Sequence, residues 1–204
     1  MIAAIAETPA VCEQIHLPLQ SGSSRVLKAM RRTYDANRYL ALVDRLRTAI
    51  PDLALGTDII VGFPGETEAE FAELLAMVEE VRFDSAFTFV YSPRSGTEAA
   101  EMADQVDPDV KRERMERLVE IVQRIAAERN ADRVGRVEEV LVEGQSRNDD
   151  ALLRGRTRRN TTVNFAGDAE PGDLVDVVVE RATSTSLAGT QADRAGRARP
   201  LAAF

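Results

Sequence analysis

The segment TDIIVGFPGET, residues 57–67, joins a buried-strand pattern to residue types that often surround a bound ligand. Residues 54–63 are nearly all apolar, which predicts a strand buried on both faces. Thr67 and Glu70 predict a capping box for the helix that follows. Glycines between such a strand and helix let the backbone approach a ligand closely, while a tight turn without a ligand is the alternative. The candidate ligand-contacting residues of this turn are Gly62, Phe63, Pro64, Gly65 and Glu66.

Two further polar loops follow predicted strands and favour a pocket. The loop HLPLQSGS (16–23) ends a predicted strand over residues 11–17, and the loop YSPRSGT (91–97) ends one over residues 85–91. The carboxyl ends of parallel strands open onto one rim, so three such loops indicate a pocket better than one does. Gln20 and Ser21 belong to the first of these loops. Arg94 belongs to the other, where a salt bridge at the rim is the alternative role.

Composition excludes several kinds of chemistry. His16 is the one histidine, which excludes a His-rich metal site, and it lies within or beside a predicted buried strand, so we expect a structural role rather than a Ser/His/Asp triad. Cys12 is the one cysteine; alone it cannot hold zinc or an iron–sulfur cluster, and its apolar surroundings predict a core residue. We therefore predict no metal ligands in this chain. The net charge of −8 argues against a protein coated in positive charge for nucleic-acid binding.

One local basic patch stands out against this acidic background. Arg154, Arg156, Arg158 and Arg159 place four cations within six residues. In a strand, the first three would share one face and form a stripe suited to phosphate contacts. A merely solvated face is the alternative. Asn160 follows the stripe and could contact an RNA backbone or simply turn the chain.

The order of elements predicts an α/β domain followed by a small β domain. Strand and helix patterns alternate over the first two thirds, which is typical of a parallel sheet covered by helices. Asp107-Pro108 predicts the start of a charged helix that runs to about residue 133. Beyond it, short strands over 137–143, 152–157, 161–165 and 174–181 predict a small antiparallel barrel. We therefore divide the chain into residues 1–131, residues 132–190 and a flexible tail, 191–204.

Five motifs carry a resemblance to a known family. In order along the chain they are HLPLQSGS, VLKAMRRTY (26–34), TDIIVGFPGET, FTFVYSPRSGTEAA (87–100) and MADQVD (102–107). With them, the chain from about residue 4 to residue 190 resembles the MiaB-type radical-SAM tRNA methylthiotransferases. The segment LLRGRTRRNTTVNF (152–165) is similar to the TRAM domain that ends those enzymes.

This resemblance implies a fold, a reaction and a set of partners. The fold would be the second half of a radical-SAM partial (β/α) barrel followed by an OB-like TRAM barrel. The reaction would add a methylthio group to carbon 2 of N6-isopentenyladenosine at tRNA position 37, using S-adenosylmethionine and two 4Fe–4S clusters. Partners would be the tRNA anticodon stem-loop and an electron donor. Residues 62–66 would line S-adenosylmethionine, Gln20 and Ser21 would lie near the cluster-side rim, and Arg94 would face a carboxylate.

One departure from the family is plain. Neither the three cysteines of the family's N-terminal domain nor its Cys-x3-Cys-x2-Cys loop occurs here, so the chain resembles a fragment that is inactive alone. A non-catalytic module that binds RNA and S-adenosylmethionine is the alternative. Within the enzyme class, the alternative substrate is threonylcarbamoyladenosine at the same tRNA position, which sister enzymes modify; a third relative modifies an aspartate of a ribosomal protein. With no apolar run near the roughly 18 residues of a membrane span and no secretory signal, we expect a cytoplasmic protein without a membrane partner.

Overall fold

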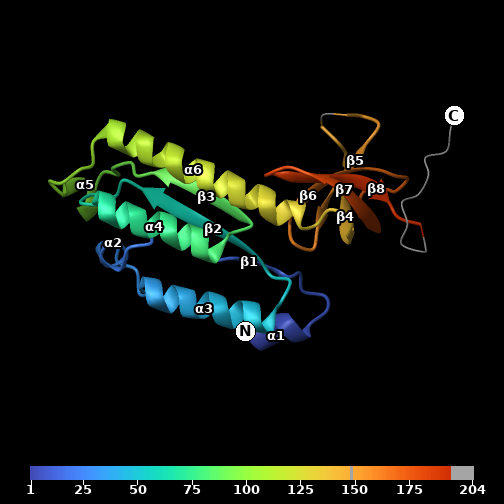
Figure 1. Cartoon of the computed structure of the whole chain (residues 1–204), viewed down its shortest axis with the longest axis horizontal. Helices are drawn as coiled ribbons and strands as arrows, with labels where there is room; N and C mark the ends of the chain where they lie inside the picture. The colour runs from blue at the N-terminus through green and yellow to red at the C-terminus, as the bar shows by residue number, and fades with distance from the viewer. Residues whose placement is uncertain (148, 194–204) are drawn as a thin grey trace. The chain divides into compact units, whose positions relative to one another are not determined.

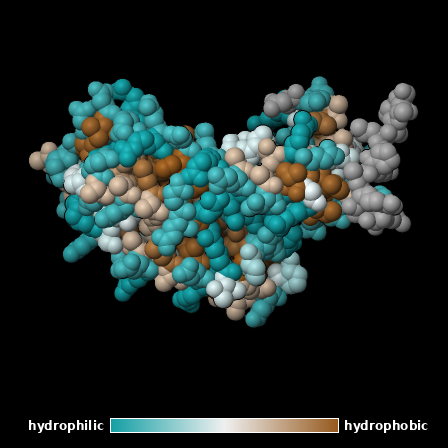
Figure 2. All heavy atoms as spheres, viewed as in Figure 1, coloured by the Kyte–Doolittle hydropathy of each residue, from teal (hydrophilic) through white to brown (hydrophobic). Residues whose placement is uncertain are grey.

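The computed structural model describes residues 1–147 and 149–193, which form two compact units. The first unit holds residues 1–7 and 15–125, and the second holds residues 8–14 and those from 126 onward (Figure 1). Most of the predicted tail, residues 194–204, lies outside the described residues. The face drawn in Figure 2 is mostly hydrophilic, as a chain with 29% charged residues leads one to expect. No helix in the described part of the chain is long and apolar enough to cross a membrane.

A three-stranded sheet in the order β1-β2-β3 organises the first unit. Its strands are β1 (Gln14–His16), β2 (Ala54–Val61) and β3 (Ser85–Val90). The helices are α1 (Ile2–Glu7), α2 (Ser24–Ala29), α3 (Ala36–Ala49), α4 (Glu68–Val81), α5 (Glu98–Glu101) and α6 (Pro108–Ala131). β2 and β3 run parallel, with Asp58 opposite Phe87. The two strands therefore end at the same edge of the sheet.

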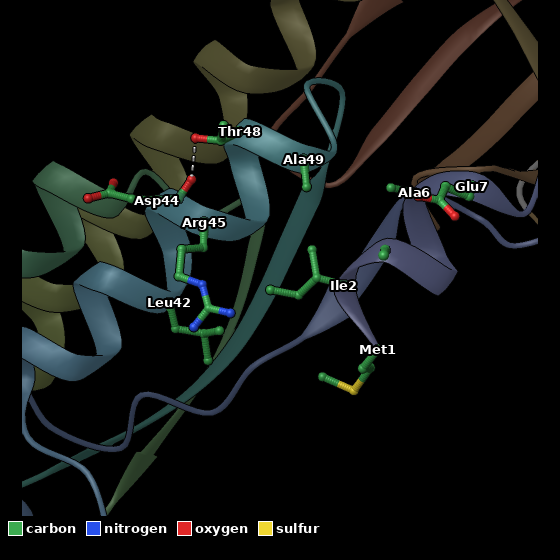
Figure 3. Close-up of a pocket in the computed structure, with 10 residues that line it drawn as sticks. Met1, Ile2, Ala6, Glu7, Leu42, Asp44, Arg45, Thr48 and Ala49 are labelled. Atoms are coloured by element: carbon green, nitrogen blue, oxygen red, sulfur yellow. Dashed lines mark hydrogen bonds between the residues drawn. The ribbon is translucent and has the colours of Figure 1, made fainter.

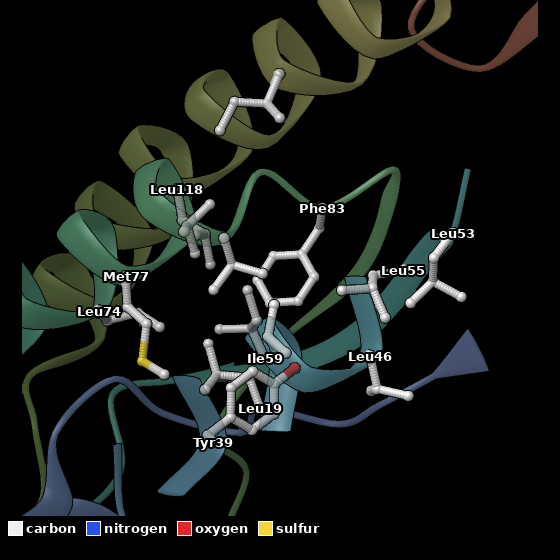
Figure 4. Packing of buried hydrophobic residues seen from close by; sticks show 14 of the residues in the cluster. Leu19, Tyr39, Leu46, Leu53, Leu55, Ile59, Leu74, Met77, Phe83 and Leu118 are labelled. Carbon is white, nitrogen blue, oxygen red and sulfur yellow. The ribbon is translucent and has the colours of Figure 1, made fainter. Parts of the chain in front are cut away.

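The helices bury their apolar stripes against one face of this sheet. In α3 the buried residues are Tyr39, Val43 and Leu46, at the spacing of one helical face. Leu74 and Met77 of α4 meet the same core, as do Leu118 of α6 and the strand residues shown in Figure 4. Beside α3, the short helix α1 leaves a mostly apolar hollow (Figure 3). The opposite face of the sheet is open at Phe87 and Phe89 of β3, which are 63% and 51% exposed.

The second unit contains a closed barrel in the order β4-β5-β6-β8-β7. Its strands are β4 (Val137–Gln145), β5 (Leu153–Thr157), β6 (Thr162–Ala166), β7 (Leu174–Ala182) and β8 (Ser186–Gln191). Inward-facing residues alternate along the strands and meet in one core, which includes Val140, Val163, Phe165 and Val177. The predicted α/β unit and small barrel are thus both confirmed.

Several predicted elements differ from the structure. The barrel is not wholly antiparallel, because β8, which was not predicted, pairs in parallel with β6. The polar run over 183–191 hides this strand from an apolar pattern, and its end at Gln191 falls where the flexible tail was expected to begin. The predicted strand over 11–17 shrinks to three residues. Cys12 is exposed rather than in the core, because it precedes that short strand and no sheet covers it.

Candidate functional site

The turn after β2 is built from two glycines in the left-handed region. Gly62 has a φ of 74° and Gly65 a φ of 73°, values that favour glycine. A Cβ on Gly62 would lie 2.4 Å from the Lys111 side chain, and one on Gly65 would lie 2.2 Å from a carboxylate oxygen of Asp104. Glycine is therefore required at both positions for two reasons: the backbone is left-handed, and a neighbouring side chain occupies the space that a Cβ would need.

Glu66, a predicted ligand contact, turns inward. Its side chain is fully buried, and Oε2 accepts hydrogen bonds from the Gly62 amide at 2.8 Å and from Arg114 Nη1 at 3.0 Å. Burial raises the pKa of this carboxyl above its ordinary value, against the opposing effects of the Gly62 amide and Arg114. The other oxygen, Oε1, is buried and has no hydrogen-bond partner among the described residues.

A pocket of about 430 Å³ lies where β2 and β3 end. Most of its lining is apolar or aromatic, with Arg31, Arg32 and Glu98 as its charged members. The lining residues are Ala29, Met30, Arg31, Arg32, Ile60, Phe63, Tyr91, Thr97, Glu98, Ala99 and Met102. Phe63 and Tyr91 pack edge to face with ring centroids 5.3 Å apart. The Tyr91 hydroxyl is buried without a partner in the described structure, so an acceptor or donor is left for a ligand.

Of the residues predicted to contact a cofactor, Phe63 is the one that lines this pocket in the described part of the chain. Gln20, with a φ of 68°, is held to β2 by main-chain hydrogen bonds to Asp58 and Ile60, and its side chain accepts from Arg32 Nη2 at 2.8 Å. Ser21 is fully buried. Arg94 is exposed, and its carbonyl accepts hydrogen bonds from Thr97.

The prediction missed the residues that α2 and α5 bring to the pocket. Arg31 follows α2 in a left-handed conformation (φ 57°) and pairs with Glu98 of α5. Met30 and Met102 add flexible apolar side chains from the same two regions. The adjacent arginines in VLKAMRRTY are the sequence feature that could have indicated this part of the pocket. They lie about thirty residues from the turn after β2, so the sequence alone does not show that both segments line the same pocket.

The arginine stripe of the barrel divides into two parts. Arg154 and Arg156 lie on β5, where both guanidinium groups approach Glu143, at 3.5 and 3.4 Å. Arg158 lies in the turn after β5 rather than on the strand face, because the strand ends at Thr157. Arg159, in the same turn, is 9% exposed.

Arg158 is engaged by several oxygens of the second unit. Its guanidinium donates to both carboxylate oxygens of Glu13, at 2.8 and 2.9 Å, and to the carbonyls of Pro9 and Val11. Glu139 lies 3.3 Å away, and the hydrogen bond to Glu13 is the main cause of the raised pKa of Arg158. Asn160 turns the chain at a φ of 61°, and its carbonyl accepts from Arg156 Nη1 at 3.1 Å.

Known proteins match both units. Residues 1–78 match the family model of the Radical SAM superfamily, and residues 132–191 match that of the TRAM domain. The chain is 54% identical over 192 residues to tRNA-2-methylthio-N(6)-dimethylallyladenosine synthase of Clostridium botulinum, which covers 94% of this chain and 43% of that protein. This chain is a relative of the MiaB-type radical-SAM methylthiotransferases. The resemblance seen in its motifs is thereby confirmed.

A second curated relative agrees with this relationship. The corresponding synthase of Clostridium perfringens is 51% identical over 190 residues, 93% of this chain and 42% of that protein. The chain therefore spans less than half the length of these methylthiotransferases. Coproporphyrinogen III oxidase from Escherichia coli, a radical SAM enzyme of known structure, matches 55% of this chain and 27% of its own with 21% identity and a TM-score of 0.48. A likeness of that size adds nothing to the assignment.

The iron–sulfur clusters of radical-SAM methylthiotransferases do not fit the residues of this chain. A cluster is held by several cysteine thiolates, and Cys12 is the one cysteine in the sequence. Across residues 1–147 and 149–193, no group of three or more His, Cys, Asp or Glu side chains could hold a metal ion.

Proposed function

We propose that this chain carries the S-adenosylmethionine pocket and the RNA-binding domain of a tRNA methylthiotransferase. The observation that carries the proposal is the 54% identity to a tRNA-2-methylthio-N(6)-dimethylallyladenosine synthase over 94% of the chain. The substrate would be N6-isopentenyladenosine at position 37 of the tRNA anticodon stem-loop, in the cytoplasm. In the complete reaction, S-adenosylmethionine and two clusters supply the radical chemistry and the sulfur, with electrons from a donor protein.

The pocket beside β2 and β3 suits S-adenosylmethionine in size and in chemistry. Its volume lies within the roughly 300–1,000 Å³ of small-ligand sites. The Phe63 and Tyr91 rings offer aromatic surface for adenine, and the buried Tyr91 hydroxyl offers an unused hydrogen bond. Arg31 and Arg32 offer cations for the methionine carboxylate. These residues would bind and orient the molecule.

Calorimetric titration with S-adenosylmethionine tests this part of the proposal. We expect Phe63→Ala to weaken binding by roughly tenfold or more, equivalent to about 1.4 kcal/mol, because the variant removes the aromatic wall. Phe87→Ala is the matched control, since Phe87 is an aromatic residue of the same unit that does not line the pocket. Absence of binding by the wild-type chain, or equal affinities for all three proteins, would refute this assignment.

The TRAM domain supports RNA contact through the arginines of β5. Arg154 and Arg156 lie beside a single shared carboxylate, Glu143, so a phosphate can compete for them. Arg158 already has two carboxylates and two carbonyls as partners. We therefore expect Arg156 to bind RNA without a rearrangement of the barrel. Arg158 would bind RNA only if its present partners were displaced.

Salt titrations with a tRNA anticodon stem-loop separate these roles. Replacing Arg154 and Arg156 together by Ala should lower affinity and reduce the slope of log affinity against log salt by roughly 0.7–0.9 for each lost phosphate contact. Arg158→Ala should change the slope less. Should the double variant keep the wild-type slope and affinity, the stripe is a solvated face and RNA binds elsewhere.

A non-catalytic module that binds RNA and S-adenosylmethionine is the second candidate, favoured by the single cysteine. Anaerobic reconstitution with iron and sulfide tests whether the chain is catalytic by itself. We expect no charge-transfer absorption of a 4Fe–4S cluster and no 5′-deoxyadenosine, because one thiolate cannot replace three. Formation of 5′-deoxyadenosine by this chain would contradict that expectation.

A further inference from the structure

A buried arginine of α6 reaches the turn that follows β2. The Arg114 side chain is 5% exposed, and its Nη1 donates to both the carbonyl and the Oε2 atom of Glu66, each at 3.0 Å. The Glu66 carboxylate in turn accepts the Gly62 amide at 2.8 Å. Arg114, 48 residues away in sequence from Glu66, thus contacts one end of the five-residue turn directly and is linked to the other end, Gly62, through the Glu66 carboxylate.

The remaining polar contacts of the turn come from other elements. The Gly65 amide donates to the Asp104 carbonyl at 2.8 Å, and the Gly65 carbonyl accepts a hydrogen bond from Arg25. Within the turn, the Glu66 amide donates to the Phe63 carbonyl. Because Gly62 and Gly65 both take left-handed conformations, the turn has backbone freedom that these contacts must restrict.

From these contacts we infer that Arg114 is a positioning residue for the S-adenosylmethionine pocket. It acts through Glu66: by fixing the carboxylate and the carbonyl of Glu66, it fixes the Gly62 amide and so the direction in which Phe63 presents its ring to the pocket. This inference rests on the proposed function of that pocket. It also gives a role to the inward-facing Glu66, which binds no ligand directly in this arrangement.

The physical reason is the cost of an unpaired buried charge. Without the guanidinium, the buried Glu66 carboxyl has lost its cationic partner and is favoured in the neutral form. A neutral carboxyl is a weaker acceptor for the Gly62 amide than a charged one. The turn would then sample other conformations while the helices and the sheet, whose core is apolar, stay folded.

Arg117 provides a matched control on the same helix. It lies one turn further along α6, donates to Glu68 at 2.8 Å and stacks over Phe71 at 5.0 Å from the ring centroid. Arg114 also donates to Glu68, at 3.2 Å, and lies 5.4 Å from the same ring. The two arginines thus share Glu68 and Phe71 as partners. In the described structure Arg117 forms ion pairs with Glu68 and Glu113 and makes no contact with Glu66.

Amide hydrogen exchange and ligand titration on the full chain test the inference. In Arg114→Gln we expect the amides of Gly62 and Glu66 to exchange roughly tenfold faster or more, with core strand amides unchanged. Affinity for S-adenosylmethionine should fall by a similar factor, while RNA affinity stays at the wild-type value. Arg114→Lys should recover part of both losses, since it restores the charge but not the fork of donors. Arg117→Gln should change neither quantity.

Each outcome decides for or against the inference. If exchange at Gly62 and Glu66 is unchanged in Arg114→Gln, or rises equally in Arg117→Gln, Arg114 is not the positioning residue. If Arg114→Gln fails to fold, Glu66→Gln provides the same exchange measurement with the arginine intact, and unchanged exchange at Gly62 there overturns the inference. Failure of wild type to bind S-adenosylmethionine refutes the proposed function instead, because the exchange result stands on its own.

Discussion

Glu70, at the first turn of α4, shows how one carboxylate can join a capping box to a distant element. Its Oε2 accepts from the amide and hydroxyl of Thr67, each at 2.9 Å, which completes the box that the sequence predicts. Arg25 donates to both oxygens of the same carboxylate. The hydrogen bond from Arg25, with those from Thr67, lowers the pKa of Glu70 to about 2.

This lowered pKa predicts a pH-dependent loss of stability. A carboxylate with a folded pKa below its ordinary value stabilises the fold above the ordinary pKa, and that contribution is lost as the pH falls. For Glu70 the window runs from about pH 4.5 down to about 2. Since Arg25 is 54% exposed and screened by water, we expect a contribution of about 1–3 kcal/mol.

Denaturant unfolding of Glu70→Gln measures this contribution. At pH 7 the variant should be less stable than the wild type, and the difference should shrink as the pH approaches 2. Glu73→Gln, an exposed position on the same helix, should match the wild type at each pH. A stability difference for Glu70→Gln that stays constant between pH 7 and pH 2 would rule out this account.

Among the elements, β8 closes the barrel and requires a glycine to do so. A Cβ on Gly189 would lie 2.0 Å from the Val178 carbonyl oxygen, on the neighbouring strand β7. The Val178 carbonyl belongs to the backbone and cannot move aside as the end of a flexible side chain can. A larger residue at position 189 would therefore push β7 and β8 apart. This close approach explains why glycine stands at position 189 of β8.

We expect Gly189→Ala to destabilise the barrel by about 1–3 kcal/mol, the range for overpacking. Ala188→Ser is the control, because it changes the adjacent residue of β8 by a single atom at a half-exposed position, at a cost within about 0.5 kcal/mol. Thermal unfolding followed by circular dichroism gives both values. Equal melting temperatures for the two variants would show that β8 does not pack as closely as the structure indicates.

At the scale of the whole molecule, the sheet of the first unit ends in two edge strands, β1 and β3. β3 carries the exposed Phe87 and Phe89 on one face, and exposed apolar side chains on an edge strand favour aggregation. The exposed aromatic surface of this sheet therefore lies at its β3 edge.

We expect Phe87→Ser combined with Phe89→Thr to raise the concentration at which the full chain stays monomeric, because the variant removes the exposed aromatic surface. Leu174→Ser is the control, since Leu174 is 65% exposed on β7 of the barrel. Light scattering across a concentration series compares the three proteins. Equal aggregation of the double variant and the wild type would place the cause elsewhere on the surface.

Sequence alone determined the family, the two classes of domain, the capping box of α4 and two of the segments that line the pocket, the turn after β2 and the loop after β3. The family follows from the resemblance of its motifs, and the elements follow from patterns that span a few residues, namely apolar runs, helical spacing and strand-end glycines. The tertiary structure decided which side chains face the pocket, because those contacts join distant segments. Glu66 turns inward toward Arg114, 48 residues away, and Arg158 meets Glu13 across 145 residues. No local rule reaches that far, since burial and ion pairing depend on what the fold brings alongside.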